Sequence, residues 1–510
     1  MLRRPLMMNT LIRDQSILSS WAMAAEIQYP LSRIFIGSDK TVAICASQIF
    51  VLDSKSGTVE ASATVSSAEK NVSSVVRIAA VDETYQHLVT SGDDKRLRVW
   101  DVNHLKELSC REIPKRANVL KLSQDGQTIL VADKFGDIFS YPLVPPEPAQ
   151  QPQPAEIPGS KSVAVAMHDN PHGTLILGHA SIITDFVLTH GEKQVISADR
   201  DEHVRVSWYP EGWDVDRYCL GHRKFVSALE IPLCAPSILI SGGGDPELYV
   251  WEYKVGKNIA RIPVWDYVRP FIKVKNGRRR PEKPQGKKNK KKAVEEGVAE
   301  DVEMIPESGE EVLVVSKIST VQLGEENVVV FSAVGSSALF YFTWPSSLDF
   351  GAVQVGHFDL TNPVTDFTVA HNGILWASVD PTWTTAPGAV NATESTNSKR
   401  VRRLVWKGSE IVEDESDSQL AQGLDQGCDV KGPASETHTL SLYEHLISLP
   451  KTAEFDSADG GEDVSVPTDI TSGPGLRASA RQKTKEELEK RKALTQEAAR
   501  ATKQPRVEET

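Results

Sequence analysis

Cysteines are few and scattered in this sequence of 510 residues. The five of them, Cys45, Cys110, Cys219, Cys234 and Cys428, include no Cys-x-x-Cys pair. This pattern argues against a disulfide framework and against a structural zinc site. It is typical of a protein from a reducing compartment.

Long hydrophobic runs and cofactor-binding loops are also missing. No apolar stretch reaches the roughly 18 residues that a membrane span needs, so we expect no membrane partner. There is no Walker loop and no G-x-S-x-G turn, and the run of three glycines, Gly242–Gly244, lies between two predicted strands. We therefore predict a non-catalytic chain that binds no cofactor of its own.

The balance of charge excludes one class of partner. The formal net charge is −12, so the chain as a whole is not expected to bind nucleic acid or an anionic membrane through bulk charge. Any contact with RNA would have to come from a local basic patch.

The sequence does contain a repeated pattern of short strands. Two successive copies occupy Leu175–Tyr253, and each has a Gly-His pair, two alternating apolar runs, an Asp-containing turn and a third run that ends near an aromatic residue. The pairs Gly178-His179 and Gly221-His222 lie about 40 to 45 residues apart, which is the period of WD repeats. Each WD repeat corresponds to one propeller blade of four antiparallel strands.

Weaker copies bring the number of repeats to seven, at 30–53, 72–102, 115–142, 174–209, 220–253, 311–344 and 358–406. We predict an all-β, WD-repeat β-propeller of seven four-stranded blades over residues 29–410, with disordered insertions and tails. Residues 1–28 are predicted as a lead-in, 144–161 as a Pro-rich loop between blades, and 256–310 as a charged disordered insertion. Residues 411–510 are predicted as an acidic and charged tail with short helices, among them a docking helix in ETHTLSLYEHLISLP.

Each good repeat has an Asp six residues before its terminal position, where a carboxylate can accept the unpaired N–H groups of a tight turn. A His from the preceding loop can join this Asp to a Ser on the neighbouring strand. Ser, His and Asp also make up hydrolase triads, but the same set recurs in two repeats, which favours a structural role. The residues assigned to that role are His179, Ser197, Asp201, His222, Ser241, Asp245, Asp94, Trp100 and Trp251.

The two central repeats carry a more specific signal. At Ile196–Pro210, ISADRDEHVRVSWYP, followed by LGHRKFVSALEIP and LISGGGDPELYVWEY, the sequence resembles the fungal-type WD-repeat, non-catalytic subunit of the tRNA (guanine-N7) methyltransferase. VADKFGD and SGDDKRLRVWD are supporting matches. A generic WD repeat supplies Gly-His and Trp-Asp, but not Arg-Asp-Glu-His followed by Arg-Val-Ser. The match is close over about 170–255, and beyond Tyr253 it is one of layout only.

This resemblance implies a propeller that binds and stabilises a separate catalytic subunit, forming a heterodimer. The pair would methylate N7 of a guanosine in the variable loop of tRNA, with S-adenosylmethionine on the partner and with tRNA contacted directly or through the partner. We expect a nuclear protein because of the basic run described below, with the cytoplasm left open as a second location.

The resemblance also implies that charged residues on the middle blades meet the catalytic partner. Arg is suited to this role because it can hold a carboxylate with two hydrogen bonds. A solvated charged turn is the alternative reading. The turn-capping role is sufficient to explain Asp201, and Lys134 in VADKFGD is a further, weaker candidate. The matching positions are Arg200, Glu202, His203, Arg205, Arg223 and Lys224.

A basic run occupies Lys273–Lys292, with eleven Lys and Arg against one Glu from Phe271 to Lys292. It fits a nuclear import signal, an electrostatic arm for tRNA phosphates, or a solvated linker. The absence of aromatic residues after Phe271 disfavours base reading and makes import the preferred role. The residues concerned are Arg278, Arg279, Arg280, Lys287, Lys288, Lys290, Lys291 and Lys292.

Two other functions remain open from the sequence. A generic WD-repeat adaptor, for example in ribosome assembly, would have unrelated partners and no effect on tRNA methylation. A propeller enzyme would need catalytic or metal-binding residues near its axis, and the sequence contains no such constellation.

Overall fold

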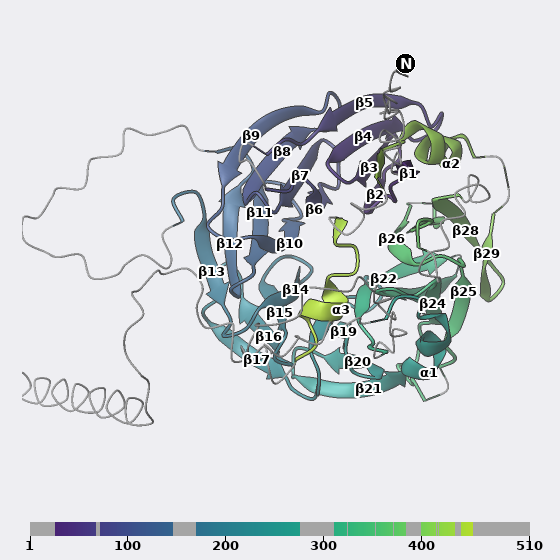
Figure 1. Ribbon diagram of the computed structural model, residues 1–510. Coiled ribbons are helices and arrows are strands. Elements are labelled where there is room, and N and C mark those ends of the chain that lie inside the picture. The colour runs from purple at the N-terminus through teal and green to yellow at the C-terminus, as the bar shows by residue number, and fades with distance from the viewer. Residues whose placement is uncertain are drawn as a thin grey trace, which may run out of the picture. The chain divides into compact units, whose positions relative to one another are not determined.

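Seven blades follow one another around a common axis (Figure 1). The computed structural model describes residues 26–67, 72–145, 170–275 and 311–451, with gaps at 324, 352, 371, 384–398, 415, 417 and 434–439. The chain divides at Pro450 into two compact units, and the second lies outside the described residues except for Lys451. Seven four-stranded antiparallel sheets make up the first unit, so the prediction of a seven-bladed all-β propeller is confirmed.

Each blade consists of four consecutive strands. Blade 1 contains β2 (Arg33–Ile36), β3 (Lys40–Cys45), β4 (Gln48–Asp53) and β5 (Val59–Thr64). Blade 2 contains β6 (Val76–Val81), β7 (His87–Gly92), β8 (Arg96–Asp101) and β9 (Lys106–Glu112). Blade 3 contains β10 (Ala117–Leu122), β11 (Thr128–Asp133), β12 (Asp137–Pro142) and β13 (Thr174–Gly178). Blade 4 contains β14 (Ile183–Leu188), β15 (Gln194–Asp199), β16 (Val204–Trp208) and β17 (Val215–Cys219).

The remaining three blades follow the same order. Blade 5 contains β18 (Val226–Glu230), β19 (Ile238–Gly243), β20 (Glu247–Glu252) and β21 (Lys257–Pro263). Blade 6 contains β22 (Val315–Leu323), β23 (Glu326–Ala333), β24 (Ala338–Thr343) and β25 (Gly356–Asp359). Blade 7 contains β26 (Val364–Val369), β27 (Leu375–Val379), β28 (Val401–Lys407) and β29 (Glu410–Glu413).

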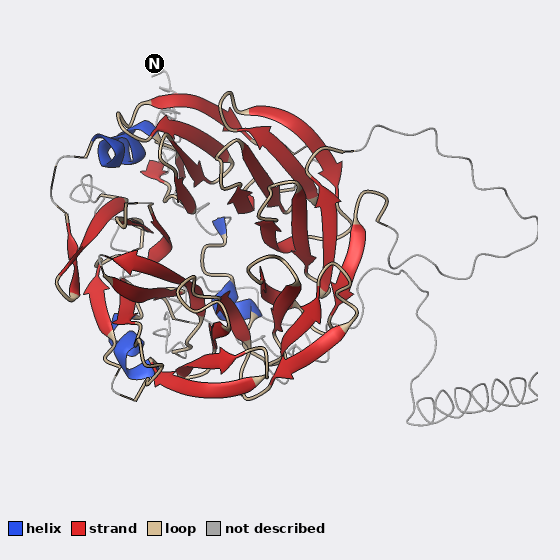
Figure 2. Cartoon of the chain, turned by 180° about the vertical axis from the view of Figure 1, so that it is seen from behind, coloured by secondary structure: helices blue, strands red, loops and turns tan. Residues whose placement is uncertain are grey.

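Helices are short and few among the described residues, as Figure 2 shows from behind. The segments α1 (Trp265–Val268) and η2 (Arg269–Phe271) follow blade 5, whereas α2 (Gln419–Gln422) and η3 (Gly423–Gly427) follow blade 7. The strand β30 (Lys431–Pro433) pairs with β1 (Glu26–Gln28), and α3 (His445–Ser448) comes last.

Burial follows the position of a strand in its blade. The second strands are almost fully buried, as in β15 and β19, because both faces pack against neighbouring blades. The fourth strands are largely exposed, as in β5 and β9. The core is therefore a series of clusters between adjacent blades, such as the one joining β19 and β20 to β22, β23 and β24.

Two ranges predicted to lie between blades are placed differently in the structure. The range 256–310 was predicted as disordered, but β21, α1 and η2 lie in its first part, and only 276–310 falls outside the described residues. The fourth strand β21 is mostly exposed, so it lacks the apolar run that marks a strand in the sequence. The Pro-rich loop interrupts blade 3 between β12 and β13 instead of separating two blades.

The predicted lead-in and tail are also partly structured. β1 lies in the lead-in, and β29, α2, η3 and β30 lie in the predicted tail. Leu420, Leu424 and Cys428 are buried in one cluster with residues of blades 1 and 7, so this part of the tail belongs to the core. The docking helix expected in ETHTLSLYEHLISLP is present as α3.

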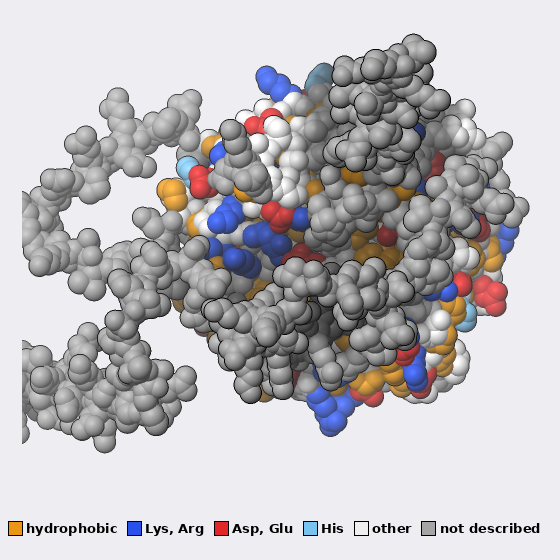
Figure 3. All heavy atoms as spheres, in the orientation of Figure 1, with side chains coloured by type: hydrophobic (Ala, Val, Ile, Leu, Met, Phe, Trp, Pro, Cys, Tyr) orange, Lys and Arg blue, Asp and Glu red, His pale blue; other side chains and the backbone are white. Residues whose placement is uncertain are grey.

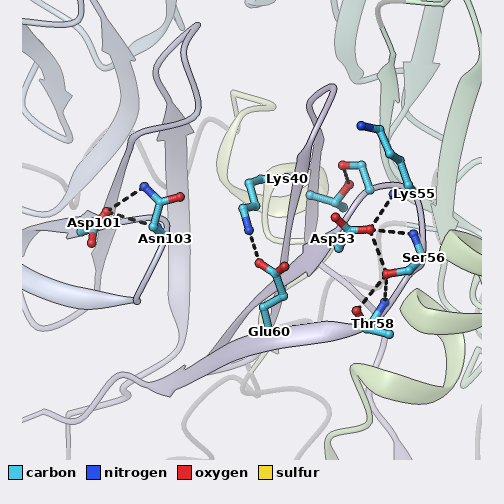
Figure 4. A network of polar contacts seen from close by, with 10 residues as sticks. Lys40, Asp53, Lys55, Ser56, Thr58, Glu60, Asp101 and Asn103 are labelled. Carbon is cyan, nitrogen blue, oxygen red and sulfur yellow. Dashed lines mark hydrogen bonds and ion pairs between the residues drawn. The ribbon is translucent and has the colours of Figure 1, made fainter.

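Turns on the outer side of the ring are closed by aspartates. Asp53 accepts the backbone N–H groups of Ser56 at 2.7 Å and Lys55 at 3.1 Å, and Asp101 does the same for Asn103 in blade 2 (Figure 4). The hydrogen bonds from Ser56 hold the pKa of Asp53 below its ordinary value. Asp53 and Asp101 therefore supply the acceptors for unpaired N–H groups in these two turns.

The ring closes without a blade shared between the two ends of the chain. Instead, blade 7 contacts blade 1 as interior blades contact each other. Thr365 Oγ1 donates to Leu31 O at 2.7 Å, and Asp366 accepts the Ile34 N–H at 3.1 Å. Between blades 5 and 6, Ser227 Oγ donates to Val315 O at 2.6 Å, and Glu230 accepts the Thr320 N–H at 2.9 Å.

Arg400 fastens this junction from within. Its side chain is 1% exposed, and its guanidinium donates to the carbonyl oxygens of Tyr29 at 2.9 Å, Leu424 at 3.1 Å and Cys428 at 3.3 Å. Its backbone N–H donates to the Asp425 carboxylate at 2.7 Å. Arg400 thus joins blade 7, the strand before blade 1 and the segment after blade 7.

Replacing Arg400 with Met should lower the free energy of unfolding by roughly 2 to 4 kcal/mol, because several buried carbonyl groups lose their donor. Denaturant unfolding followed by tryptophan fluorescence measures the change. The control is Arg403→Met, which removes a more exposed partner of Asp414. Its effect should be below about 1 kcal/mol. Equal effects from the two substitutions would contradict the role assigned to Arg400.

Candidate partner-binding face

The repeated His, Ser and Asp residues come together in blades 4 and 5. His222 Nδ1 lies 2.8 Å from Asp245 Oδ2, and its Nε2 lies 2.7 Å from Ser241 Oγ, which also accepts the Trp251 indole N–H at 2.8 Å. The matching contacts of His179 are 2.9 Å to Asp199 and 2.8 Å to Ser197. Because the same network occurs twice inside the blades, it braces the loop before each blade.

The carboxylate in blade 4 is Asp199, so the assignment of Asp201 to this network is wrong. Asp199 lies two residues after Ser197, and the backbone N–H of Asp201 donates to Asp199 at 2.8 Å. In blade 5 the position two residues after Ser241 is Gly243, where a Cβ would lie 2.0 Å from the Phe225 carbonyl oxygen. That blade therefore takes its carboxylate from Asp245, two residues later.

Burial determines the charge state of the blade 4 network. Burial lowers the pKa of His179, which favours the neutral ring. Burial opposes ionisation of Asp199, but hydrogen bonds from His179 and from the His203 backbone hold the pKa of Asp199 below its ordinary value. A neutral His between a carboxylate and a hydroxyl is stable packing, and Ser197 is fully buried, so its hydroxyl is closed to a substrate.

Blade 2 replaces the His with an ion pair. Asp94 accepts from Arg98 at 2.5 Å, and both side chains are buried. The Trp100 indole donates to Thr90 Oγ1 at 2.9 Å, as Trp251 does to Ser241. Asp94 and Trp100 therefore have a structural role in blade 2 as well.

The predicted partner residues lie on loops at one face of blades 4 and 5. Arg200, Glu202 and His203 are in the β15–β16 turn, and Arg223 and Lys224 are in the β17–β18 loop. The backbone N–H groups of Arg223 and Lys224 donate to Asp245 at 3.2 and 3.3 Å, while their side chains are exposed. The buried network therefore fixes the loop that presents these two cations.

Arg205 occupies an unusual environment on this face. Its residue is 8% exposed, and Nη1 donates to the Gly178 carbonyl at 2.9 Å. Its buried Nε and Nη2 atoms have no hydrogen-bond partner among the described residues. Burial lowers the pKa of Arg205, with Tyr218 opposing that shift. A buried guanidinium with unused donors favours the arrival of an acceptor from outside.

A cavity of about 360 Å³ lies beside Arg205 and gives such an acceptor a place. Its wall also contains Gly178–Ser181, Asp199, Asp201, His203, Tyr218 and Leu220. This volume is within the size range of small binding pockets in proteins.

The rim of the cavity combines apolar and basic groups. Tyr218, Leu220 and Phe135 are 43%, 66% and 50% exposed. The amines of Lys115 and Lys134 lie 4.5 and 5.4 Å from the centre of the Phe135 ring. Figure 3 shows Lys and Arg side chains gathered on this side of the ring, over the blade 3 region of Figure 1. An apolar centre edged by cations is typical of a protein-binding surface.

Blade 3 is held against blade 4 at this rim. Gly136 has a φ of +98°, and a Cβ there would lie 2.3 Å from the Ser181 carbonyl oxygen. The turn that carries Phe135 and Lys134 can therefore approach the cavity wall only with glycine at this position.

The sequence did not reveal Phe135, Tyr218 or Leu220 as surface residues. Apolar residues in strands are normally predicted to be buried. Strand β17 is the exception, because its polar residues Asp216 and Arg217 indicate an outer strand, and Val215 and Tyr218 in it are exposed. Lys134 was found because it lies in a recognised motif.

Other kinds of site are not evident in the part of the chain that the structure describes. No group of three or more His, Cys, Asp or Glu side chains there is placed to hold a metal ion. Among the same residues, no helix has the length and hydropathy needed to cross a membrane. The basic positions from Arg278 to Lys292 lie outside the described residues.

Comparisons with known proteins agree with this architecture. The relatives are named non-catalytic subunits of tRNA (guanine-N(7)-)-methyltransferase. The trm82 subunit of Aspergillus clavatus is 35% identical over 239 residues, which cover 38% of this chain and 48% of that protein. The trm82 subunit of Aspergillus oryzae is 36% identical over 204 residues, covering 33% and 41%. The wdr4 subunit of Dictyostelium discoideum is 35% identical over 191 residues, covering 37% and 39%.

These matches span less than half the length of each of these relatives. Among solved structures, a chain of the mitotic checkpoint complex has a TM-score of 0.47 at 12% identity and covers 74% of this chain and 95% of that one, a likeness too distant to bear on function. The family model described as the tRNA methyltransferase TRM82 WD40 domain matches residues 46–172 and 164–404. This match covers more than half of the sequence and confirms the resemblance found at Ile196–Pro210. The chain therefore belongs to the TRM82 WD40-domain family.

Proposed function

We propose that this chain is the non-catalytic subunit of a tRNA (guanine-N7) methyltransferase. It binds and stabilises a separate catalytic subunit, which carries S-adenosylmethionine and forms N7-methylguanosine in the variable loop of tRNA. Family membership supports the reaction, and the Arg205 cavity is the observation that supports partner binding on this face.

Docking starts from the incomplete hydrogen bonding of Arg205. A carboxylate of the catalytic subunit enters the cavity and, once the groups that cover Nε and Nη2 move aside, accepts from these two unused donors. An Arg–carboxylate pair of this kind gains two parallel hydrogen bonds in a partly dehydrated site. The acidic group enters beside two existing carboxylates, Asp199 and Asp201. Asp199 is already occupied by His179 and by the backbone N–H groups of Asp201 and His203, and the charge of Arg205 must outweigh the repulsion from Asp201.

The rim adds area and direction. Tyr218, Leu220 and Phe135 lose water against the partner, and burial of such side chains is the main favourable term in association. Arg223 and Lys224 are exposed, so they raise the rate of encounter with an acidic surface more than the final affinity.

The chain contributes rigidity to the complex. The β15–β16 turn and the β17–β18 loop are fixed by buried His–Asp contacts in adjacent blades. A partner loop that is ordered against these turns loses less freedom on binding than one that meets a mobile surface. The same preorganisation keeps the active site of the catalytic subunit in one arrangement.

Contact with tRNA follows from the local charge. The net charge of −12 disfavours binding of tRNA through the overall charge of the chain. The cations over blade 3, next to the partner-binding face, can instead contact the phosphates of a tRNA bound to the heterodimer. We assign tRNA to the heterodimer, with direct contact by this chain confined to that patch.

Replacing Arg205 with Met should weaken partner binding by more than about 30-fold, because loss of a buried charged partner costs roughly 2 to 5 kcal/mol. The free chain should keep its stability or gain about 1 kcal/mol, because an incompletely paired buried charge is removed. Calorimetric titration with the catalytic subunit, denaturant unfolding and methyl transfer to tRNA measure the three quantities.

The control is Lys254→Met, an exposed cation on the β20–β21 turn. It should leave binding and methyl transfer unchanged. Wild-type affinity in the Arg205 variant would move the interface elsewhere, and methyl transfer by the purified chain alone would contradict the non-catalytic role. Capture of unrelated complexes without methyl transfer would favour a generic adaptor.

We also propose nuclear import through the two basic clusters, Arg278–Arg280 and Lys287–Lys292. Replacing these cations with Gln should shift a fluorescently tagged protein from the nucleus to the cytoplasm, since import receptors read the positive charge. The change leaves Lys273 and Val274 in place, whose backbone N–H groups donate to Gly335. Unchanged nuclear retention with weaker tRNA binding would assign the run to an RNA arm instead.

A further inference from the structure

The C-terminal strap, defined as Leu440–Leu449, runs across the middle of the ring. It includes α3, which Figure 1 shows over the centre of the propeller. Arg77 of blade 2 donates to the Leu440 carbonyl at 2.7 Å, and Arg116, just before blade 3, pairs with Glu444 at 2.8 Å. On blade 7, Asp380 accepts from the Tyr443 hydroxyl at 2.7 Å.

The strap is anchored by apolar side chains on its inner side. Leu446 and Leu449 are 2% and 5% exposed, and they pack in one cluster with Phe225, Val274 and Val314. Ile447, between them, is 60% exposed. The strap therefore has a buried side that is held by blades 5 and 6, and an open side.

Phe225 connects this cluster to the partner-binding face. It directly follows Arg223 and Lys224 in the β17–β18 loop and is 4% exposed. Its ring lies so close to Gly244 that a Cβ there would be 2.7 Å from Phe225 Cε1. The loop thus has two supports: Asp245 holds the backbone of Arg223 and Lys224, and the strap covers Phe225.

We propose that docking of the C-terminal strap is coupled to binding of the catalytic subunit through the Gly221–Phe225 loop. The inference rests on the partner role proposed above. With the strap docked, Phe225 is held and the loop presents Arg223 and Lys224 in one arrangement. With the strap released, Phe225 and Val314 lose their cover, and the loop gains other conformations that the partner must order on binding.

The coupling is reciprocal. A partner that binds the ordered loop favours the docked strap by the same factor by which the strap favours the partner. The readout in the free chain is hydrogen exchange of the strap amides, and the readout in the complex is partner affinity.

The test compares Leu446→Asp with Ile447→Asp, the same substitution on the buried and open sides of α3. Leu446→Asp should speed exchange of the strap amides and weaken partner binding about tenfold, within the 5- to 150-fold range usual for coupled sites. Ile447→Asp should change neither quantity by more than about twofold. Circular dichroism checks that the propeller stays folded.

A second arm needs no substitution. Saturating catalytic subunit should slow exchange of the wild-type strap amides by about the same tenfold factor. Wild-type affinity of the Leu446 variant, together with faster strap exchange, would overturn the coupling alone. Equal loss of affinity in the Ile447 variant would overturn it in favour of direct contact. Failure of the wild-type chain to bind the catalytic subunit would overturn both this inference and the proposed function.

Discussion

Closure of the ring between blade 7 and blade 1 is the constraint on which the rest of the molecule depends. The same polar contacts used between interior blades, a hydroxyl donating to a carbonyl and a carboxylate accepting an N–H, reappear between Thr365, Asp366 and blade 1. Arg400 and the β1–β30 pair add the fastening that a shared blade would otherwise provide. A closed ring leaves no sheet edge facing an empty gap. It also fixes where each blade lies around the axis, and therefore where the loops of that blade lie.

The partner-binding face shows how a structural network can serve binding without taking part in it. His179 and His222 are buried and fully occupied, so they offer nothing to a ligand. By holding the turns, they fix Arg223, Lys224 and the neighbourhood of Arg205. The chain itself supplies acceptors for only some of the N–H groups of Arg205. Leaving Nε and Nη2 without an acceptor lowers the stability of the free chain but keeps two donors for a partner.

Much of this architecture could be predicted from the sequence, because strand periodicity and turn residues are local signals. The seven repeats and the contacts of His222, Ser241 and Asp245 were accessible in this way. The choice between Asp199 and Asp201 was not, because the two blades take their carboxylate from different positions: blade 5 has Gly243 where blade 4 has Asp199. Strand β21 was missed because its residues are mostly exposed or half-buried and so show no apolar run. The tail segment α2–β30 was missed because its stability comes from packing onto blades 1 and 7. Phe135 and Leu220 were missed because exposure is a property of the assembled ring.

The pairing of β1 with β30 also has a consequence for biosynthesis. Blade 1 emerges from the ribosome early, but its neighbour β26 and the strand β30 are made near the end of the described chain. At 5 to 20 residues per second, the roughly 370 residues between β5 and β30 take about 20 to 70 seconds to synthesise. During that time β2 of blade 1 lacks its neighbour β26, so this side of blade 1 stays uncovered until the last strands have been made.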